Sequence, residues 1–451
     1  MTMIFAEQVL TVEGWRRNAR ICVAEGRIKS VELDVAPVSG DDIHEVVVPA
    51  MANLHSHAFQ RGMAGLAEQR GPTADSFWSW RNVMYHFALT MSPEQMEAVA
   101  AQLYVEMLEA GFCRVGEFHY LHHDRDGRPY GNLAEMAERI VAATDETGIE
   151  LTLLPVFYAN SGFGGAEPLE GQRRFINNLD RFAALLEACR GFEQTRPSMV
   201  TGVAPHSLRA VTPEELGALT ALPFEGPIHI HAAEQVKEVE DSLAWSGQRP
   251  IEWLLAHADL SSRWCVIHAT HMTEAEAMGL ARSGAVAGLC PITEANLGDG
   301  VFPATSFLDA GGRFGVGSDS NVLIGLADEL RQLEYSQRLG EKARNVVADT
   351  GGSSGRRLFD GASAGGAVAL GCETGIGAGL PANLVSLKLR HPIGFAGDRV
   401  LDSWIFANGA TVDSVWVAGR KLVEGGWHVR RDAIAQRFRK AMGELLAEFA
   451  G

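Results

Sequence analysis

Short apolar runs alternate with longer amphipathic segments through the middle of the chain. The runs with the length of buried strands are 47–54, 114–118, 151–157, 202–205, 228–231, 265–268, 285–290 and 314–318. Most of them precede a segment whose apolar residues recur at helical spacing, which predicts parallel strand–helix units and an α/β fold. Eight such units over roughly 250–300 residues match a closed (β/α)8 barrel of the TIM type.

Three of the predicted helices have clear N-terminal signals. Ser92, Thr212 and Thr273 are each followed, three residues later, by Gln or Glu. In such a capping box two side chains and two backbone N–H groups bond reciprocally, which satisfies donors that the first helical turn leaves open. We therefore expect helices to begin directly after these three residues.

The two ends of the chain have a different, strand-like texture. Its segments are 21–23, 28–31 and 46–48 near one end, and 384–389, 403–406 and 415–417 near the other. Gly and Asp punctuate these bursts, as in small antiparallel sheets. We expect both ends to build one smaller β-sandwich domain, residues 1–48 plus 375–430, into which the barrel, residues 49–374, is inserted.

The last segment, residues 431–451, is predicted to be a helix. Ile434, Phe438, Met442 and Leu445 recur there at helical spacing and form an apolar stripe. We interpret this segment as a packing helix at a subunit interface and expect the chain to form a homodimer.

Composition excludes several classes of protein. Hydrophobic residues make up 46% and charged residues 21% of the chain, which argues against disorder. The net charge of −17 disfavours binding to nucleic acid or to an anionic membrane, although a locally basic pocket can still hold a small anion. No signal peptide or membrane span is indicated, and the six cysteines lack Cys-x-x-Cys spacing. We expect a cytoplasmic enzyme with reduced thiols.

Metal-binding residue types stand at the ends of several predicted strands. His55 and His57 end the first strand on the same face, and His231 and Asp319 end the fifth and the eighth. A lone His-x-His pair is more often structural, but the C-terminal strand ends of this barrel converge on one site. Three imidazoles and a carboxylate suit Zn²⁺, so these four residues are predicted to hold it.

Four segments resemble the amidohydrolase superfamily. They are residues 48–57 (VPAMANLHSH), 231–234 (HAAE), 266–268 (VIH) and 317–319 (GSD). The resemblance covers nearly the whole chain and implies a metal-dependent hydrolase with a barrel and a split β-domain. One departure is Asn383, where the superfamily pattern has Asp; it lies in the β-domain, away from the chemistry.

Many amidohydrolases bind two metals, bridged by a carboxylated lysine or a glutamate at the end of strand three or four. Neither strand three (151–158) nor strand four (202–206) offers a lysine here. We therefore expect one Zn²⁺ per chain. The ending of strand five agrees with this, because it resembles the deaminase branch.

Chemical roles follow from this arrangement. Zinc lowers the pKa of a bound water toward 7, and Glu234 would pass that water's proton to the leaving nitrogen. His268, at the end of strand six, is expected to bond the attacking water or the tetrahedral centre, with a fourth ligand or a core histidine as alternatives. Asp319 serves as a ligand and a second proton acceptor. His229 is expected to face the side opposite to His231 and is interpreted as a packing residue.

The barrel mouth indicates an anionic substrate. Arg81 and Arg209 can each hold a carboxylate, whereas a structural role for Arg61 stays open. Residues 55–61, 116–120 and 204–209 look like formimidoylglutamate deiminase, a family that hydrolyses N-formimidoyl-L-glutamate to N-formyl-L-glutamate and ammonia in histidine degradation. On that resemblance the substrate-binding residues are Gln60, Arg81, Tyr120, His206 and Arg209, with Ser320 beside the metal ligand.

Two alternatives remain. The first is another deaminase of the same branch that acts on guanine, cytosine or an adenosine-like ring, or a triazine hydrolase; the mouth arginines disfavour it. The second is a non-catalytic protein that binds zinc or a metabolite. Glu234 and His268 disfavour the second alternative, because a binding protein has no use for a general acid–base pair.

Overall fold

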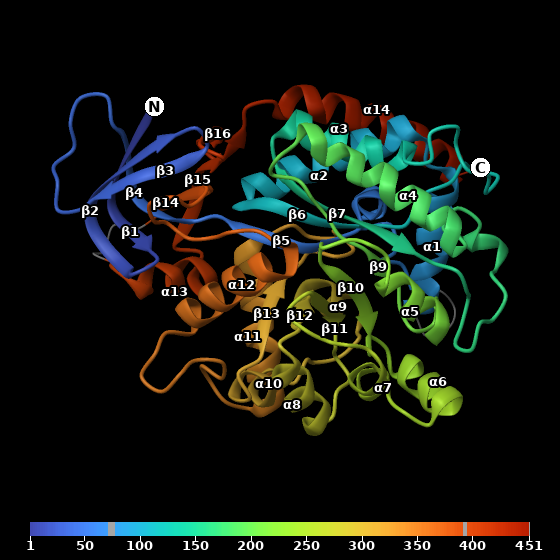
Figure 1. Ribbon diagram of the computed structural model, residues 1–451. Helices are drawn as coiled ribbons and strands as arrows, with labels where there is room; N and C mark the ends of the chain where they lie inside the picture. The colour runs from blue at the N-terminus through green and yellow to red at the C-terminus, as the bar shows by residue number, and fades with distance from the viewer. Residues whose placement is uncertain (71–76, 391–394, 451) are drawn as a thin grey trace.

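The computed structural model describes residues 1–70, 77–390 and 395–450 (Figure 1). The predicted domain ranges 375–430 and 431–451 therefore include a few residues, 391–394 and 451, that lie outside the described part. No described helix combines the length and the apolar character that crossing a bilayer requires.

Both ends of the chain contribute to one mixed sheet, at the left of Figure 1. Its strands, in spatial order, are β17 (Trp427–His428), β16 (Arg420–Glu424), β15 (Ala410–Val417), β14 (Leu384–Leu389), β4 (Asp42–Pro49), β1 (Thr2–Thr11), β2 (Gly14–Ala24) and β3 (Arg27–Glu32). Neighbours are antiparallel except β1 and β4, which are parallel. Among the described residues these strands form one continuous eight-stranded sheet, to which both ends of the chain contribute.

The prediction of a strand at residues 403–406 is wrong. These residues lie in helix α13 (Asp398–Ala407). Its buried residues include Val400, Leu401, Trp404 and Ile405, which form a helical stripe. The four-residue window was too short to distinguish a strand from part of a helix.

The middle of the chain contains two parallel sheets. The first consists of β5 (Met51–Ser56), β6 (Phe112–His119), β7 (Glu150–Phe157) and β8 (Val200–Thr201), and β9 (Ala204–Pro205) also pairs with β7. The second consists of β10 (Ile228–Ala232), β11 (Trp264–His268), β12 (Val286–Leu289) and β13 (Arg313–Val316). All eight predicted runs contain strand, and the first run is divided between β4 and β5.

Isolated parallel bridges connect the two parallel sheets at both edges. Ser56 pairs with Asp319, and Val203 pairs with Ile228. Every residue of β5, β6, β10 and β11 is buried, as expected of parallel strands that are covered on both faces. The ends of β5, β10 and β13 therefore lie close together.

Helices follow most of these strands. They are α1 (Phe77–Thr90), α2 (Pro93–Glu109), α3 (Glu135–Thr147), α4 (Leu179–Gly191), α5 (Pro213–Thr220), α6 (Val236–Ser246), α7 (Pro250–His257), α8 (Glu274–Ser283), α9 (Pro291–Leu297), α10 (Ala304–Asp309), α11 (Leu326–Glu341) and α12 (Ser354–Leu370), with short 3₁₀ turns η1 (Ala58–Met63), η2 (Glu170–Gln172) and η3 (Phe192–Thr195). The capping boxes at Ser92, Thr212 and Thr273 are confirmed.

The predicted C-terminal helix is α14 (Arg431–Ala450), which packs against α2 and α1 and lies at the top of Figure 1. Its residues Ile434 and Leu445 are buried within the chain. Part of the apolar stripe that suggested a subunit interface is thus covered by the chain's own helices.

Candidate metal centre and active site

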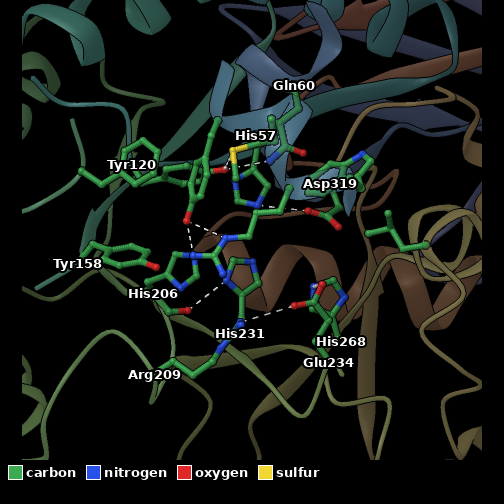
Figure 2. Close-up of a pocket in the computed structure, with 16 residues that line it drawn as sticks. His57, Gln60, Tyr120, Tyr158, His206, Arg209, His231, Glu234, His268 and Asp319 are labelled. Carbon is green, nitrogen blue, oxygen red and sulfur yellow. Dashed lines mark hydrogen bonds and ion pairs between the residues drawn. The ribbon is translucent and has the colours of Figure 1, made fainter. Parts of the chain in front are cut away.

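Three histidines and an aspartate converge where β5, β10 and β13 end, and Figure 2 shows three of these residues, His57, His231 and Asp319. The donor atoms of His55, His57, His231 and Asp319 all lie within 4.8 Å of one another, and all four residues are buried. Asp319 Oδ1 is 3.3 Å from His55 Nε2 and 3.2 Å from His57 Nε2. His231 Nε2 is 3.1 Å from His55 Nε2. The four predicted ligands therefore form one compact cluster.

The hydrogen bonds around this cluster leave lone pairs that face inward. Nδ1 of His57 donates to the Phe118 carbonyl at 2.9 Å, and Nδ1 of His231 donates to the His206 carbonyl at 3.1 Å. Burial lowers the pKa of His231 well below its ordinary value, so that ring carries only this proton and its Nε2 keeps a lone pair that can bind a metal ion. Carbonyl bonds of this kind orient metal-binding imidazoles. The cluster is thus suited to a metal ion.

The backbone around the site is held in an uncommon conformation. Ala233, His268, Ala269, Asp319 and Asn321 have φ values between 46° and 67°, in the left-handed region. Such strain concentrates at functional sites, where the surrounding structure enforces it. Here two backbone hydrogen bonds join the strand ends, from Asp319 N to His55 O at 2.9 Å and from His57 N to Asp319 O at 3.1 Å.

Glu234 and His268 lie side by side next to the cluster (Figure 2). Glu234 Oε1 is 3.8 Å from His268 Nε2, and Glu234 Oε2 is 3.8 Å from Arg209 Nη2. Burial raises the pKa of Glu234, which favours a group that can both accept and release a proton. Burial alone would lower the pKa of His268, but the nearby carboxylates of Glu234, Glu294 and Asp319 outweigh it and raise the pKa to about 10.

A cavity opens beside the metal cluster and the acid–base pair. It is lined by His57, Gln60, Trp80, Arg81, Met84, Tyr85, Tyr120, Tyr158, Phe175, His206, Arg209, His231, Glu234, His268, Leu297 and Asp319. Figure 2 shows the labelled members of this set pointing toward one another. Five of the six predicted substrate-binding residues therefore share one cavity with the metal cluster, and Ser320 is the exception.

Two polar groups in this cavity are buried with no hydrogen-bond partner among the described residues. They are Oε1 of Gln60 and Nε of Arg209. Nε2 of Gln60 donates to the Tyr120 hydroxyl at 2.9 Å, which orients its amide. Because buried polar groups are nearly always paired, these two atoms indicate a polar ligand that offers a donor to Gln60 Oε1 and an acceptor, such as a carboxylate, to Arg209 Nε.

Arg81 and His206 complete the polar lining. Arg81 lies on α1, and its Nε donates to the Tyr85 hydroxyl at 2.7 Å. Nδ1 of His206 bonds to Ser207 Oγ at 3.1 Å. Burial and the neighbouring Arg209 charge lower the pKa of His206 well below its ordinary value, so this ring is neutral.

Two further candidates do not line the cavity. The Ser320 hydroxyl bonds to Thr293 Oγ1 at 2.9 Å. Arg61 is ion-paired with Glu106 at 2.8 Å, which supports its structural interpretation. Neither side chain is therefore placed to hold a ligand in this cavity.

His229 packs beneath the cluster. Its Nε2 donates to the Ala369 carbonyl at 2.8 Å, in agreement with a packing role. The expectation that it faces the side opposite to His231 is wrong, because residues two apart on a strand point to the same side. The two rings differ in their depth along β10, and only His231, at the end of the strand, reaches the metal ligands.

Met84, Tyr158, Phe175 and Leu297 also line the cavity, but the sequence motifs did not mark them. Tyr158 could have been found, because it follows β7 directly and strand ends were the signal that identified the ligands. Its hydroxyl accepts a hydrogen bond from Gln172 Nε2 at 2.8 Å. Phe175 and Leu297 lie on a loop and at the end of α9, where no periodic pattern marks them.

Comparisons with known proteins agree with this geometry. A model of the Amidohydrolase family matches residues 46–422, and a model described as Formimidoylglutamate deiminase HutF, N-terminal domain, matches residues 1–45. The chain is 49% identical to a curated formimidoylglutamate deiminase from Pseudomonas aeruginosa, over 99% of this chain and 100% of that protein. The chain belongs to the formimidoylglutamate deiminase group of the amidohydrolase family.

Solved structures place this deiminase group among other amidohydrolases. An amidohydrolase from Brucella melitensis is 62% identical, with a TM-score of 0.97 over 99% of this chain and 100% of that one. A zinc-bound adenosine deaminase from Xanthomonas campestris is 21% identical, with a TM-score of 0.82 over 99% of this chain and 98% of that one. The second likeness establishes a shared fold.

Proposed function

We propose that this chain is a zinc-dependent hydrolase that converts N-formimidoyl-L-glutamate and water to N-formyl-L-glutamate and ammonia. Full-length identity to a protein named formimidoylglutamate deiminase supports the reaction. The observation that carries the substrate assignment is Arg209, whose buried Nε has no partner and faces the same cavity as Glu234. Arg209 can bind a carboxylate of the substrate, while Glu234 and His268 act on its formimidoyl group. This arrangement suits an acidic molecule whose carboxylate and reacting group are separate.

We propose one zinc ion per chain, held by His55, His57, His231 and Asp319. Three imidazole nitrogens and one carboxylate oxygen are typical zinc donors. No lysine lines the cavity within the described residues. Glu117, at the end of β6, accepts hydrogen bonds from Ala58 N at 2.7 Å and from the Tyr104 hydroxyl at 3.1 Å, so its carboxylate is not a free bridge to a second metal.

The chemistry divides between the metal and the chain's own groups. Zinc at this site would acidify water and so supply a nucleophile at neutral pH. Glu234 accepts the water's proton and delivers it to the nitrogen that leaves as ammonia. His268 donates a hydrogen bond to the oxygen that attacks the formimidoyl carbon, and so stabilises charge that develops as this carbon becomes tetrahedral. Asp319 is a second proton acceptor at the same centre.

The two carboxylates of the substrate would be held by the polar lining. Arg209 and Arg81 each offer a guanidinium, which binds a carboxylate through two parallel hydrogen bonds. Gln60, Tyr120 and His206 supply neutral polar groups that orient the rest of the molecule. Ser320 belongs to this proposal only through its position beside Asp319, because its hydroxyl is already bonded to Thr293.

We propose that the two parallel sheets are parts of one (β/α)8 barrel, residues 49–374. The bridges Ser56–Asp319 and Val203–Ile228 support closure, because they join the edge strands of both sheets. Residues 1–48 and 375–430 would form the β-domain, and 431–451 the terminal helix. A cytoplasmic homodimer completes the proposal; the six free thiols support a reducing compartment, and light scattering would measure the oligomeric state.

An ammonia-release assay tests the substrate. Purified enzyme should release ammonia from N-formimidoyl-L-glutamate faster than from N-formimidoyl-aspartate, guanine or cytosine. Ring deamination without turnover of the formimidoyl compounds would favour the first alternative and overturn this proposal. Zinc binding without turnover of any compound in the panel would favour a binding protein.

Replacement of Glu234 by Gln tests the acid–base role. Glu234→Gln keeps the shape of the side chain but cannot accept the proton, so we expect kcat to fall by at least about 100-fold while zinc stays bound. Steady-state kinetics and metal analysis of the same sample measure both quantities. Substantial remaining activity would remove Glu234 from this role.

A further inference from the structure

We propose that Glu294 is a positioning residue, which holds the His268 ring so that its Nε2 edge faces the reaction centre. The proposal rests on the function proposed above, because it concerns a step that His268 performs there. Glu294 lies on α9, outside the sequence motifs that mark the metal ligands and the cavity.

The Glu294 carboxylate is anchored at the end of strand β12. It is buried, and its Oε1 accepts the backbone N–H of Cys290 at 2.9 Å. The same oxygen faces His268 Nδ1 at 3.4 Å. The side chain thus bends back from the first turn of α9, and its backbone bond fixes where the oxygen stands.

His268 therefore has a carboxylate at each ring nitrogen. Glu294 faces Nδ1 at 3.4 Å, and Glu234 faces Nε2 at 3.8 Å. The ring is also stacked on His231, with an interplanar angle of 13°. Rotation of an imidazole about its outer bond is otherwise loosely restrained. Without Glu294, the flipped ring would turn a carbon toward Glu234 and the substrate.

The same region could be interpreted as a second metal site, since donor atoms of His268, Cys290 and Glu294 lie within 4.8 Å of one another. Positioning explains the geometry better, because Glu294 Oε1 already accepts the Cys290 N–H at 2.9 Å and faces His268 Nδ1. A metal there would replace both contacts. Zinc content therefore belongs to the test.

Glu329 on α11 provides a matched control. It is also a buried glutamate, and its Oε2 accepts the N–H of Ile292 at 3.0 Å, in the same first turn of α9. The structure gives it no contact with His268. Glu329→Ala therefore removes a comparable support of α9 while leaving the His268 ring in place.

The experiment compares Glu294→Ala, Glu294→Gln and Glu329→Ala in zinc-loaded enzyme by kcat, KM, zinc per chain and Tm. We expect Glu294→Ala to lower kcat by about 100-fold with KM and zinc content unchanged. Glu294→Gln keeps an acceptor oxygen and should lose less than about 10-fold. Glu329→Ala should keep kcat within about 3-fold, although its Tm falls as in Glu294→Ala.

Leu297 helps to separate a positioning role from a general structural one. It lies on α9 and lines the cavity, so a displaced α9 would change KM. Any of three results would overturn the proposal. Glu294→Ala could raise KM with little loss of kcat, or Glu329→Ala could lose as much kcat as Glu294→Ala. Glu294→Gln could also be as slow as Glu294→Ala. The proposal would also be overturned if wild-type enzyme held two zinc ions per chain and Glu294→Ala held only one. Failure of wild-type enzyme on N-formimidoyl-L-glutamate would instead overturn the proposed function.

Discussion

Arg209 is the residue that most directly indicates an anionic ligand. Its side chain is only 14% exposed, and its Nε has no hydrogen-bond partner within the described ranges. The carboxylate of Glu234 is 3.8 Å away, too far for a hydrogen bond. A buried cation that is incompletely paired has a free-energy cost, which an anionic ligand would offset.

Replacement of Arg209 by Met should mainly raise KM. The variant keeps most of the side-chain volume but loses hydrogen bonds to a charged group, which contribute about 1.5–3 kcal/mol each. We expect KM for N-formimidoyl-L-glutamate to rise at least about 10-fold, and steady-state kinetics measure it. Arg61→Met is the control, because Arg61 is paired with Glu106 and lies outside the cavity. Unchanged kinetics of Arg209→Met would mean that Arg209 does not touch the substrate.

At the scale of elements, the site depends on how closely β13 approaches β5. Gly317 lies just beyond β13, and a Cβ there would stand 2.7 Å from both His55 N and His55 O. Only glycine therefore allows Asp319, two residues later, to reach the histidines. This close contact lets two strands that are distant in the sequence share one metal cluster.

Gly317→Ala should loosen this contact. We expect it to lower the free energy of unfolding by about 1–3 kcal/mol and to reduce zinc below one per chain. Thermal unfolding and metal analysis measure the two effects. The control is Gly443→Ala on α14, where a Cβ meets nothing within 4 Å and helix propensity should improve slightly. Full zinc content in Gly317→Ala would show that a Cβ at residue 317 does not move Asp319 away from the histidines.

At the scale of the whole molecule, the metal cluster joins distant parts of the chain. His55 and His57 lie at the end of β5, His231 belongs to β10, and Asp319 follows β13. A ligand that binds only the folded state stabilises it by mass action. Bound metal should therefore stabilise the fold as a whole as well as supply chemistry.

Removal of metal by a chelator should lower Tm, and added zinc should restore it. The stabilisation reaches about 4 kcal/mol when free zinc exceeds its Kd a thousandfold. His229 and His231 lie on the same strand and provide matched variants. His231→Asn should lose the response of Tm to zinc, whereas His229→Asn should keep it despite the lost bond to Ala369. Equal responses of the two variants would place the metal elsewhere.

What the sequence determined by itself is the set of local elements and the residues at their ends. Apolar periodicity and capping boxes depend on neighbours within a few residues, so the strands around the site and the starts of α2, α5 and α8 were predictable. The two-residue period of a strand likewise predicted that His55 and His57 share one face.

Tertiary structure alone decided what each side chain meets. It placed residues 403–406 in a helix, directed Ser320 to Thr293, and brought Phe175 and Leu297 into the cavity. It also set Glu294 against His268, which lies 26 residues away in the chain. Such contacts depend on how separate elements pack, and no local pattern encodes the distance between them.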